Sequence, residues 1–87
     1  MGLDSVEIIL AAEEDFGLEI PDAEAARMIT VGDLQAFIVV ELRRLGRPGV
    51  DTNDIFARLR AIICRQLGVP PDAVVPSARF VKDLRID

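Results

Sequence analysis

Apolar residues recur at the three- and four-residue spacing of an amphipathic helix in three long stretches, residues 3–16, 31–45 and 54–67. Each stretch is followed directly by a glycine, a residue that commonly lies just beyond the end of a helix. Residues suited to N-capping precede the later stretches, Thr30 before the second and residues 51–53 before the third. The pattern therefore predicts three substantial helices.

The remaining segments are shorter or less regular. Residues 22–28 have room for one or two helical turns, and residues 47–53 form a polar, turn-rich linker. Residues 69–87 contain three prolines and several apolar residues, so we expect an ordered loop that packs on the helices, with a short turn near residues 80–84. No alternation typical of strands appears. The predicted fold is a single all-α domain over residues 1–87, with three main helices and one short helix.

The core is expected to draw on both halves of the chain. The side chains predicted to be largely buried are Leu3, Val6, Ile9, Leu10, Phe16, Ile20, Phe37, Ile38, Ile55, Leu59, Ile62, Leu67 and Phe80.

Charge is distributed unevenly along the chain, whose net charge is −5. Residues 1–26 contain eight acidic side chains and no basic one. This bias argues against a nucleic-acid binder and favours basic protein partners, although an acidic face that only keeps the protein soluble is the alternative. The chain has no apolar run long enough to span a membrane and no basic leader segment. Its single cysteine, Cys64, excludes an internal disulfide and favours a reducing, cytoplasmic setting.

Candidate catalytic groups are scarce. The chain contains no histidine, which excludes Ser–His and Cys–His nucleophile pairs, and Cys64 alone does not make a zinc site. Glu13 and Glu14 are adjacent, so on a helix their side chains diverge by about 100° and do not face each other. We therefore expect no enzyme, no catalytic residue and no metal site.

The two ends of the sequence read as one motif when they are joined. The chain ends in SARFVKDLRID and begins with MGLDSVEIIL. With residues 51–87 placed before residues 1–46, the chain resembles an acyl carrier protein along nearly its whole length. IICRQLGV resembles the end of that family's first helix, and SARFVKDLRID the loop before its modified serine. LDSVEIILAAEEDFGLEIPD resembles its acidic second helix, and MITVGDLQAFI its third helix passing into the fourth.

The resemblance implies a small four-helix bundle in circularly permuted order. Residues 1–46 correspond to the family's second to fourth helices, and residues 54–87 to its first helix and the loop that follows. Residues 47–53 then join the old C-terminus to the old N-terminus. A short linker between exchangeable halves allows either a monomer or a domain-swapped dimer.

The resemblance also implies a function. Acyl carrier proteins act in fatty acid and polyketide biosynthesis. They hold acyl chains as thioesters on a 4′-phosphopantetheine arm, which is attached to the serine of an Asp-Ser-Leu motif. Their acidic second helix docks on basic patches of phosphopantetheinyl transferases and of acyl-chain synthases or transferases. The partner-binding residues implied here are Asp87, Leu3, Asp4, Glu7, Glu13 and Glu14.

The attachment position is where this chain departs from the family. In register, Asp87 and Leu3 match the Asp and Leu of the motif, but Gly2 takes the place of the serine. Ser5 belongs to a second Asp-Ser pair and lies about one helical turn too late. Either the arm is absent, which the register favours, or Ser5 accepts it. The alternatives to a carrier scaffold are an unmodified pseudo-carrier or interaction module, and a helical bundle unrelated to carrier proteins.

Overall fold

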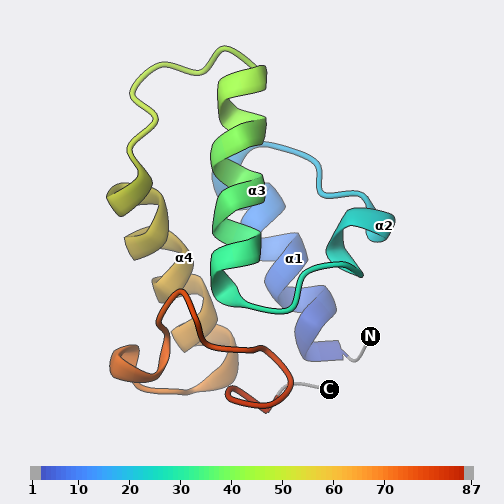
Figure 1. Ribbon diagram of the computed structural model, residues 1–87, viewed down its shortest axis with the longest axis vertical. Helices are drawn as coiled ribbons and strands as arrows, with labels where there is room; N and C mark the ends of the chain where they lie inside the picture. The colour runs from blue at the N-terminus through green and yellow to red at the C-terminus, as the bar shows by residue number, and fades with distance from the viewer. Residues whose placement is uncertain (1–2, 86–87) are drawn as a thin grey trace.

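The computed structural model describes the backbone of residues 3–85 and the side chains of residues 5–85. The described chain is helical, with α1 (Leu3–Phe16), α2 (Asp22–Ala25), α3 (Val31–Arg44) and α4 (Thr52–Leu67), followed by the short 3₁₀ helix η1 (Pro71–Ala73) (Figure 1). Within residues 3–85 the only β-type pairing is one isolated bridge, between Thr30 and Arg79. The predicted all-α fold with three main helices and one short helix is confirmed.

Capping side chains begin α3 and α4. The Thr30 hydroxyl accepts a hydrogen bond from the Asp33 N–H at 3.1 Å, and the Asp33 carboxylate accepts one from the Thr30 N–H at 3.0 Å. This reciprocal capping box satisfies donors that the helix itself leaves unpaired. Asp51 caps α4 by accepting from the Asn53 N–H at 2.8 Å and the Asp54 N–H at 3.1 Å. As a result α4 begins at Thr52, two residues before the expected start at residue 54.

Glycines in the left-handed region end the three long helices, as predicted. Gly17, Gly46 and Gly68 have φ values of +66°, +72° and +70°. A residue with a side chain is strained at such a φ, so glycine is well suited to the position that follows each helix.

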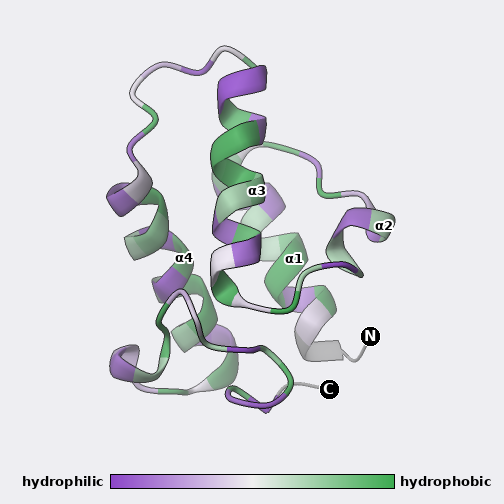
Figure 2. Cartoon of the chain, in the orientation of Figure 1, coloured by the Kyte–Doolittle hydropathy of each residue, from purple (hydrophilic) through white to green (hydrophobic). Residues whose placement is uncertain are grey.

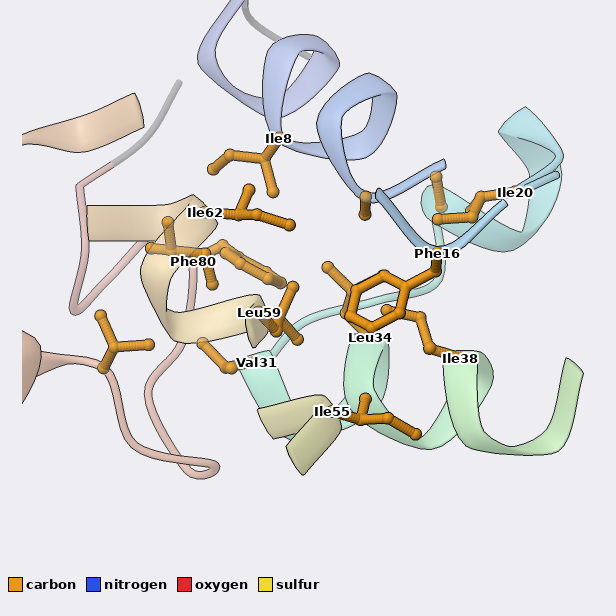
Figure 3. Close-up of a cluster of buried hydrophobic side chains, with 14 of the residues drawn as sticks. Ile8, Phe16, Ile20, Val31, Leu34, Ile38, Ile55, Leu59, Ile62 and Phe80 are labelled. Carbon is orange, nitrogen blue, oxygen red and sulfur yellow. The ribbon is translucent and has the colours of Figure 1, made fainter. Parts of the chain in front are cut away.

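The core joins both halves of the chain (Figure 3). Hydrophobic stretches occur along the helices of both halves (Figure 2). Of the residues predicted to be buried, seven are confirmed: Phe16, Ile20, Ile38, Ile55, Leu59, Ile62 and Phe80. Three more, Ile9, Phe37 and Leu67, are partly buried against this cluster. The side chain of Leu3 lies outside the described residues.

The prediction was wrong for the buried face of α1. Val6 and Leu10 are 40% and 56% exposed, whereas Ile8 and Ala12 are buried. Ile8, Ala12 and Phe16 follow one another at four-residue intervals, so they share one side of the helix. Because each residue advances by about 100°, Leu10 lies about 160° and Val6 about 120° around the helix from the middle of that side.

The segment after α4 packs on the helices, as expected. Its side chains Val74, Ala78, Phe80 and Leu84 are buried. Its backbone is also bonded to the start of α3, since the Val31 N–H donates to the Ala78 carbonyl at 2.9 Å and the Gly32 N–H to the Pro76 carbonyl at 2.8 Å. No helix in the described part of the chain is long and apolar enough to cross a membrane.

Candidate docking surface and attachment end

The outward side of α1 combines exposed acids with exposed apolar side chains. Glu7 and Glu14 are exposed and lie two helical turns apart on the same side, since seven residues make nearly two turns. Val6 and Leu10 are exposed beside them. We call Val6, Glu7, Leu10 and Glu14 the outward face of α1. An exposed apolar group rimmed by charge is typical of a surface that contacts another protein.

Glu13 has a structural contact of its own. Its carboxylate accepts a hydrogen bond from the Ile20 N–H at 2.7 Å, and its carbonyl accepts from the N–H groups of Gly17 and Leu18. These bonds fold the chain back after α1 and place Leu18 and Ile20 in the core. Glu13, one of the predicted partner-binding residues, therefore also holds the turn that follows the helix.

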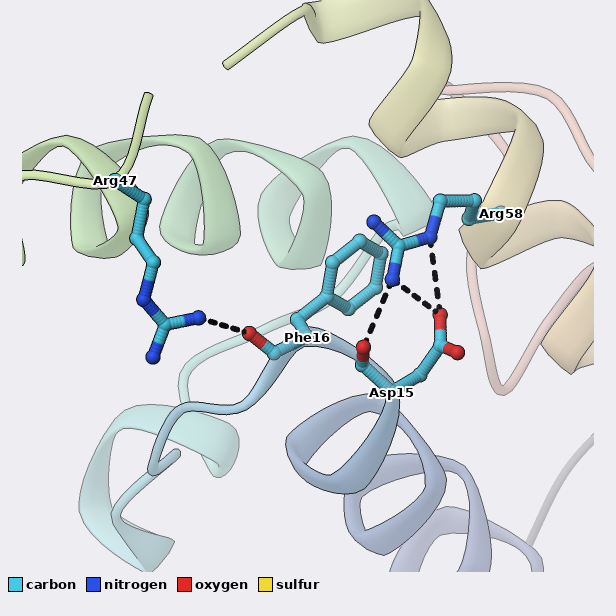
Figure 4. Close-up of polar contacts among 4 residues, drawn as sticks. All are labelled: Asp15, Phe16, Arg47 and Arg58. Atoms are coloured by element: carbon cyan, nitrogen blue, oxygen red, sulfur yellow. Dashed lines mark hydrogen bonds and ion pairs between the residues drawn. The ribbon is translucent and has the colours of Figure 1, made fainter. Parts of the chain in front are cut away.

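Two arginines from distant parts of the chain hold the C-terminal end of α1 (Figure 4). Arg58 of α4 pairs with the Asp15 carboxylate, Nη2 to Oδ2, at 3.1 Å and donates to the Asp15 carbonyl at 2.8 Å. Its guanidinium also lies 4.4 Å from the centre of the Phe16 ring. Arg47 donates to the Phe16 carbonyl at 2.9 Å and to the Gly17 carbonyl at 2.6 Å. Because α1 has no basic residue in its own last turn, these cations satisfy its terminal carbonyls.

Ser5 lies on the inward side of α1. It is half-buried and precedes Ile8, Ala12 and Phe16 at three- and four-residue intervals, which places it on the side that faces the core. Attachment of a phosphopantetheine group requires an accessible hydroxyl, and Gly2, which is expected from the sequence at the family's serine position, carries no side-chain oxygen. The residues of this chain therefore fit that prosthetic group poorly.

The structure places only part of the predicted site. Gly2 and Asp87 lie outside the described residues, as do the side chains of Leu3 and Asp4. Figure 1 shows the start of α1 and the last described residues of the C-terminal segment at the same end of the molecule. Leu84 of that segment and Ile8 of α1 also belong to one core cluster.

Asp83 stabilises the turn within the C-terminal segment. Its carboxylate accepts hydrogen bonds from the Arg79 backbone N–H at 2.8 Å and from Arg79 Nε at 3.3 Å. These bonds, the backbone one first, lower the pKa of Asp83. The expected turn near residues 80–84 is thus confirmed. The Asp83 carboxylate that accepts these bonds is ionised at neutral pH.

Sequence reasoning missed the contacts of Glu13, Arg47 and Arg58. Each arginine reaches α1 across 30 or more positions, so no local pattern marks it. The one available signal was the absence of a basic residue in the turn of α1 before Gly17. The terminal carbonyls of such a helix need hydrogen-bond donors from another part of the chain. Among the described side chains, no group of three or more His, Cys, Asp or Glu residues is arranged to hold a metal ion.

Comparison with known proteins gives matches to curated proteins, among them an acyl carrier protein. A segment of 36 residues, 41% of this chain, is 61% identical to the acyl carrier protein of Thermosynechococcus vestitus (strain NIES-2133 / IAM M-273 / BP-1). The match spans 44% of that protein, so the chain covers less than half the length of this curated relative. No family model and no solved structure matches the chain. Acyl carrier proteins are not enzymes, in agreement with the expectation that this chain is not one. The match confirms that this chain resembles the acyl carrier protein family.

Proposed function

We propose that the chain is a carrier-protein scaffold of the acyl carrier protein type, with its two halves in circularly permuted order. The observation that carries this proposal is the 61% identity over 36 residues to an acyl carrier protein. The compact all-α core supports it, because residues from both halves pack together in one cluster.

The order of the segments supports the permutation. The segment that resembles the family's first helix, in α4, follows the segments that resemble the later helices. An alignment that keeps chain order can then include only one half at a time, in agreement with a match over 41% of the chain. Permutation is tolerated when the joined ends lie close together in the fold. The linker between α3 and α4, residues 45–51, is short enough for that.

The outward face of α1 is the proposed docking surface for basic partners. Its exposed acids Glu7 and Glu14 supply attraction to basic patches, and exposed Leu10 and Val6 supply apolar contact. The complete proposed set is Asp87, Leu3, Asp4, Glu7, Glu13 and Glu14. The partner class is the phosphopantetheinyl transferases and acyl-chain synthases or transferases of fatty acid or polyketide biosynthesis in the cytoplasm.

A binding measurement tests the docking surface. The change is Glu7→Gln with Glu14→Gln, and the control is Asp54→Asn with Asp72→Asn, which removes the same number of exposed acids from α4 and η1. We expect binding to a phosphopantetheinyl transferase to weaken roughly fivefold or more for the α1 variant at low salt and to remain unchanged for the control. Equal weakening in both variants would show that net charge, and not α1, attracts the partner.

We propose further that the chain as written remains without the phosphopantetheine arm. Gly2 lacks a hydroxyl, and half-buried Ser5 lies on the inward side of α1. Small displacements of a reacting group cost orders of magnitude in rate, so a serine one turn away is a poor substitute.

Intact mass spectrometry after incubation with a phosphopantetheinyl transferase and coenzyme A tests this. The unmodified chain should keep its mass, and Gly2→Ser should gain one phosphopantetheine group. The control is Gly2→Ser combined with Ser5→Ala, which should load equally. Efficient loading of the original chain that Ser5→Ala abolishes would instead assign the arm to Ser5.

The second candidate function is a pseudo-carrier or helical interaction module that never bears the arm, as a monomer or a domain-swapped dimer. The observation that favours it is the same mismatch between the prosthetic group and Gly2 and Ser5. Failure of Gly2→Ser to load, with α1-dependent binding retained, would select this candidate.

A further inference from the structure

The linker between α3 and α4, residues 45–51, is open to solvent over most of its length. Only Val50 is partly buried, and the other linker residues are exposed. Gly46 and Gly49 have φ values of +72° and +70°. The linker therefore turns back through two left-handed positions and has few contacts that define its path.

Much of the linker stands away from the helices. An open cavity of about 230 Å³ is lined by linker residues 47–51 together with residues at the end of α1 and the start of α4, such as Asp15, Ile55 and Arg58. A linker that packed tightly would leave no such space. Its conformation is therefore fixed by a small number of specific interactions.

Arg47 is the main one of these interactions. Its guanidinium donates to the Phe16 carbonyl at 2.9 Å, at the end of α1 (Figure 4). It also donates to the Gly17 carbonyl at 2.6 Å. Directly after the left-handed Gly46, these bonds hold the start of the linker over α1. They direct residues 48–51 toward the beginning of α4.

The contacts between the helices on either side of the linker are compatible with both a closed monomer and a dimer that exchanges these helices. α4 packs against α1 and α3, and η1 follows it. If residues 52–87 were exchanged between two copies, each copy would regain these contacts from the other. The balance between a closed monomer and an exchanged dimer then depends on the linker and on concentration.

We propose that residues 45–51 form a hinge latched by Arg47, and that releasing the latch yields a dimer in which two copies exchange residues 52–87. This inference rests on the packing of the chain and does not require the carrier function. In the monomer, Gly46 must stay left-handed and Arg47 must reach α1. In the exchanged dimer α3 can continue straight into the linker, and both requirements are lifted.

Gly46→Ala and Gly68→Ala provide a matched pair of variants. The two glycines end α3 and α4 with φ values of +72° and +70°, and a Cβ at either position meets no atom within 4 Å. Both alanines therefore add the same backbone strain to the monomer. Exchange relieves that strain only at Gly46, because Gly68 keeps its conformation in either arrangement.

Size-exclusion chromatography with light scattering, after refolding at several protein concentrations, tests the hinge. We expect the dimer association constant to rise on the order of tenfold or more for Gly46→Ala and for Arg47→Ala. Gly68→Ala, and Arg43→Ala at an exposed position of α3, should remain as monomeric as the original chain. Monomers for all four variants, or equal dimerisation of Gly46→Ala and Gly68→Ala, would overturn the proposal.

The kind of dimer is tested by dilution. An exchanged dimer must open before it can separate, so the isolated Gly46→Ala dimer should persist on dilution. It should revert to monomer only after unfolding in urea and refolding at low concentration. A dimer that separates promptly on dilution would mean ordinary surface association and would also overturn the proposal.

Discussion

The two long non-helical segments of this chain differ in how they are held. Residues 69–85, after α4, are mostly irregular, but they bury Val74, Ala78, Phe80 and Leu84 and bond to the start of α3. The linker, residues 45–51, is similarly irregular, but it is exposed and its path depends on Arg47. Absence of a helix therefore says little about rigidity, since burial and backbone hydrogen bonds decide it.

The largest expected difference concerns the buried aromatic of the C-terminal segment. Phe80→Ala should lower the free energy of unfolding by about 3–5 kcal/mol, because it leaves a cavity among helices of both halves. The neighbouring Val81→Ala is the control, since Val81 is 69% exposed and should change stability by less than about 0.5 kcal/mol. Urea unfolding measures both, and similar midpoints would mean that the segment does not contribute to the core.

The contact between the C-terminal segment and α3 gives the next effect. A Cβ on Gly32 would lie 2.9 Å from the Pro76 carbonyl oxygen, a backbone atom that cannot move aside easily. Overpacking of this kind costs roughly 1–3 kcal/mol, which exceeds the gain of at most about 1 kcal/mol in helix propensity. Gly32→Ala should therefore lower the urea midpoint. A higher urea midpoint would show that the C-terminal segment can move away from residue 32 at little cost, as we expect of the linker.

Asp33, at the start of α3, makes the stability of the protein depend on pH. Hydrogen bonds from the Ile29 N–H and the Thr30 N–H lower the pKa of Asp33 below its usual 3.8. Because the folded pKa is below the unfolded one, the stabilisation is complete above the unfolded value and is lost as pH falls through the folded one. Urea midpoints between pH 7 and pH 3 should decline less steeply for Asp33→Asn than for the original chain. Parallel curves would assign the acid sensitivity to other carboxylates.

The smallest effect is expected from lengthening the linker. Two glycines inserted after Gly49 should cost less than about 0.6 kcal/mol, because the entropy of closing a loop grows slowly with its length. The same insertion after Ala78 should cost several times more, since it separates buried Ala78 from buried Phe80. Thermal unfolding of the two variants gives the comparison. Equal losses would contradict the distinction between the two segments.

The sequence was sufficient to predict the helices, because spacing, caps and glycines are local signals. Thr30 caps the start of α3 and Gly17 follows α1, as expected. The buried face of α1 was not predictable in this way, because apolar residues occur on both sides of that helix. Periodicity finds a helix, but with Ile8 inside and Leu10 outside it does not say which side meets the core.

At the candidate site, the sequence predicted the acidic character of α1 but not the tertiary contacts around it. Glu7 and Glu14 are exposed on α1, as a docking surface requires. The bonds of Glu13 to Ile20 and of Arg58 to Asp15 were not foreseen, since they depend on where the chain returns after a turn or a helix. Such tertiary contacts leave no periodic trace in the sequence.

The mixed outward face of α1 has a kinetic consequence. Exposed acids act at a distance, so Glu7 and Glu14 would mainly raise the rate at which a basic partner arrives, and added salt would slow that arrival. Val6 and Leu10 act only on contact, so they would mainly set how long the partner stays. The speed of encounter and the lifetime of the complex would thus be adjustable separately, by neighbouring side chains on a single helix.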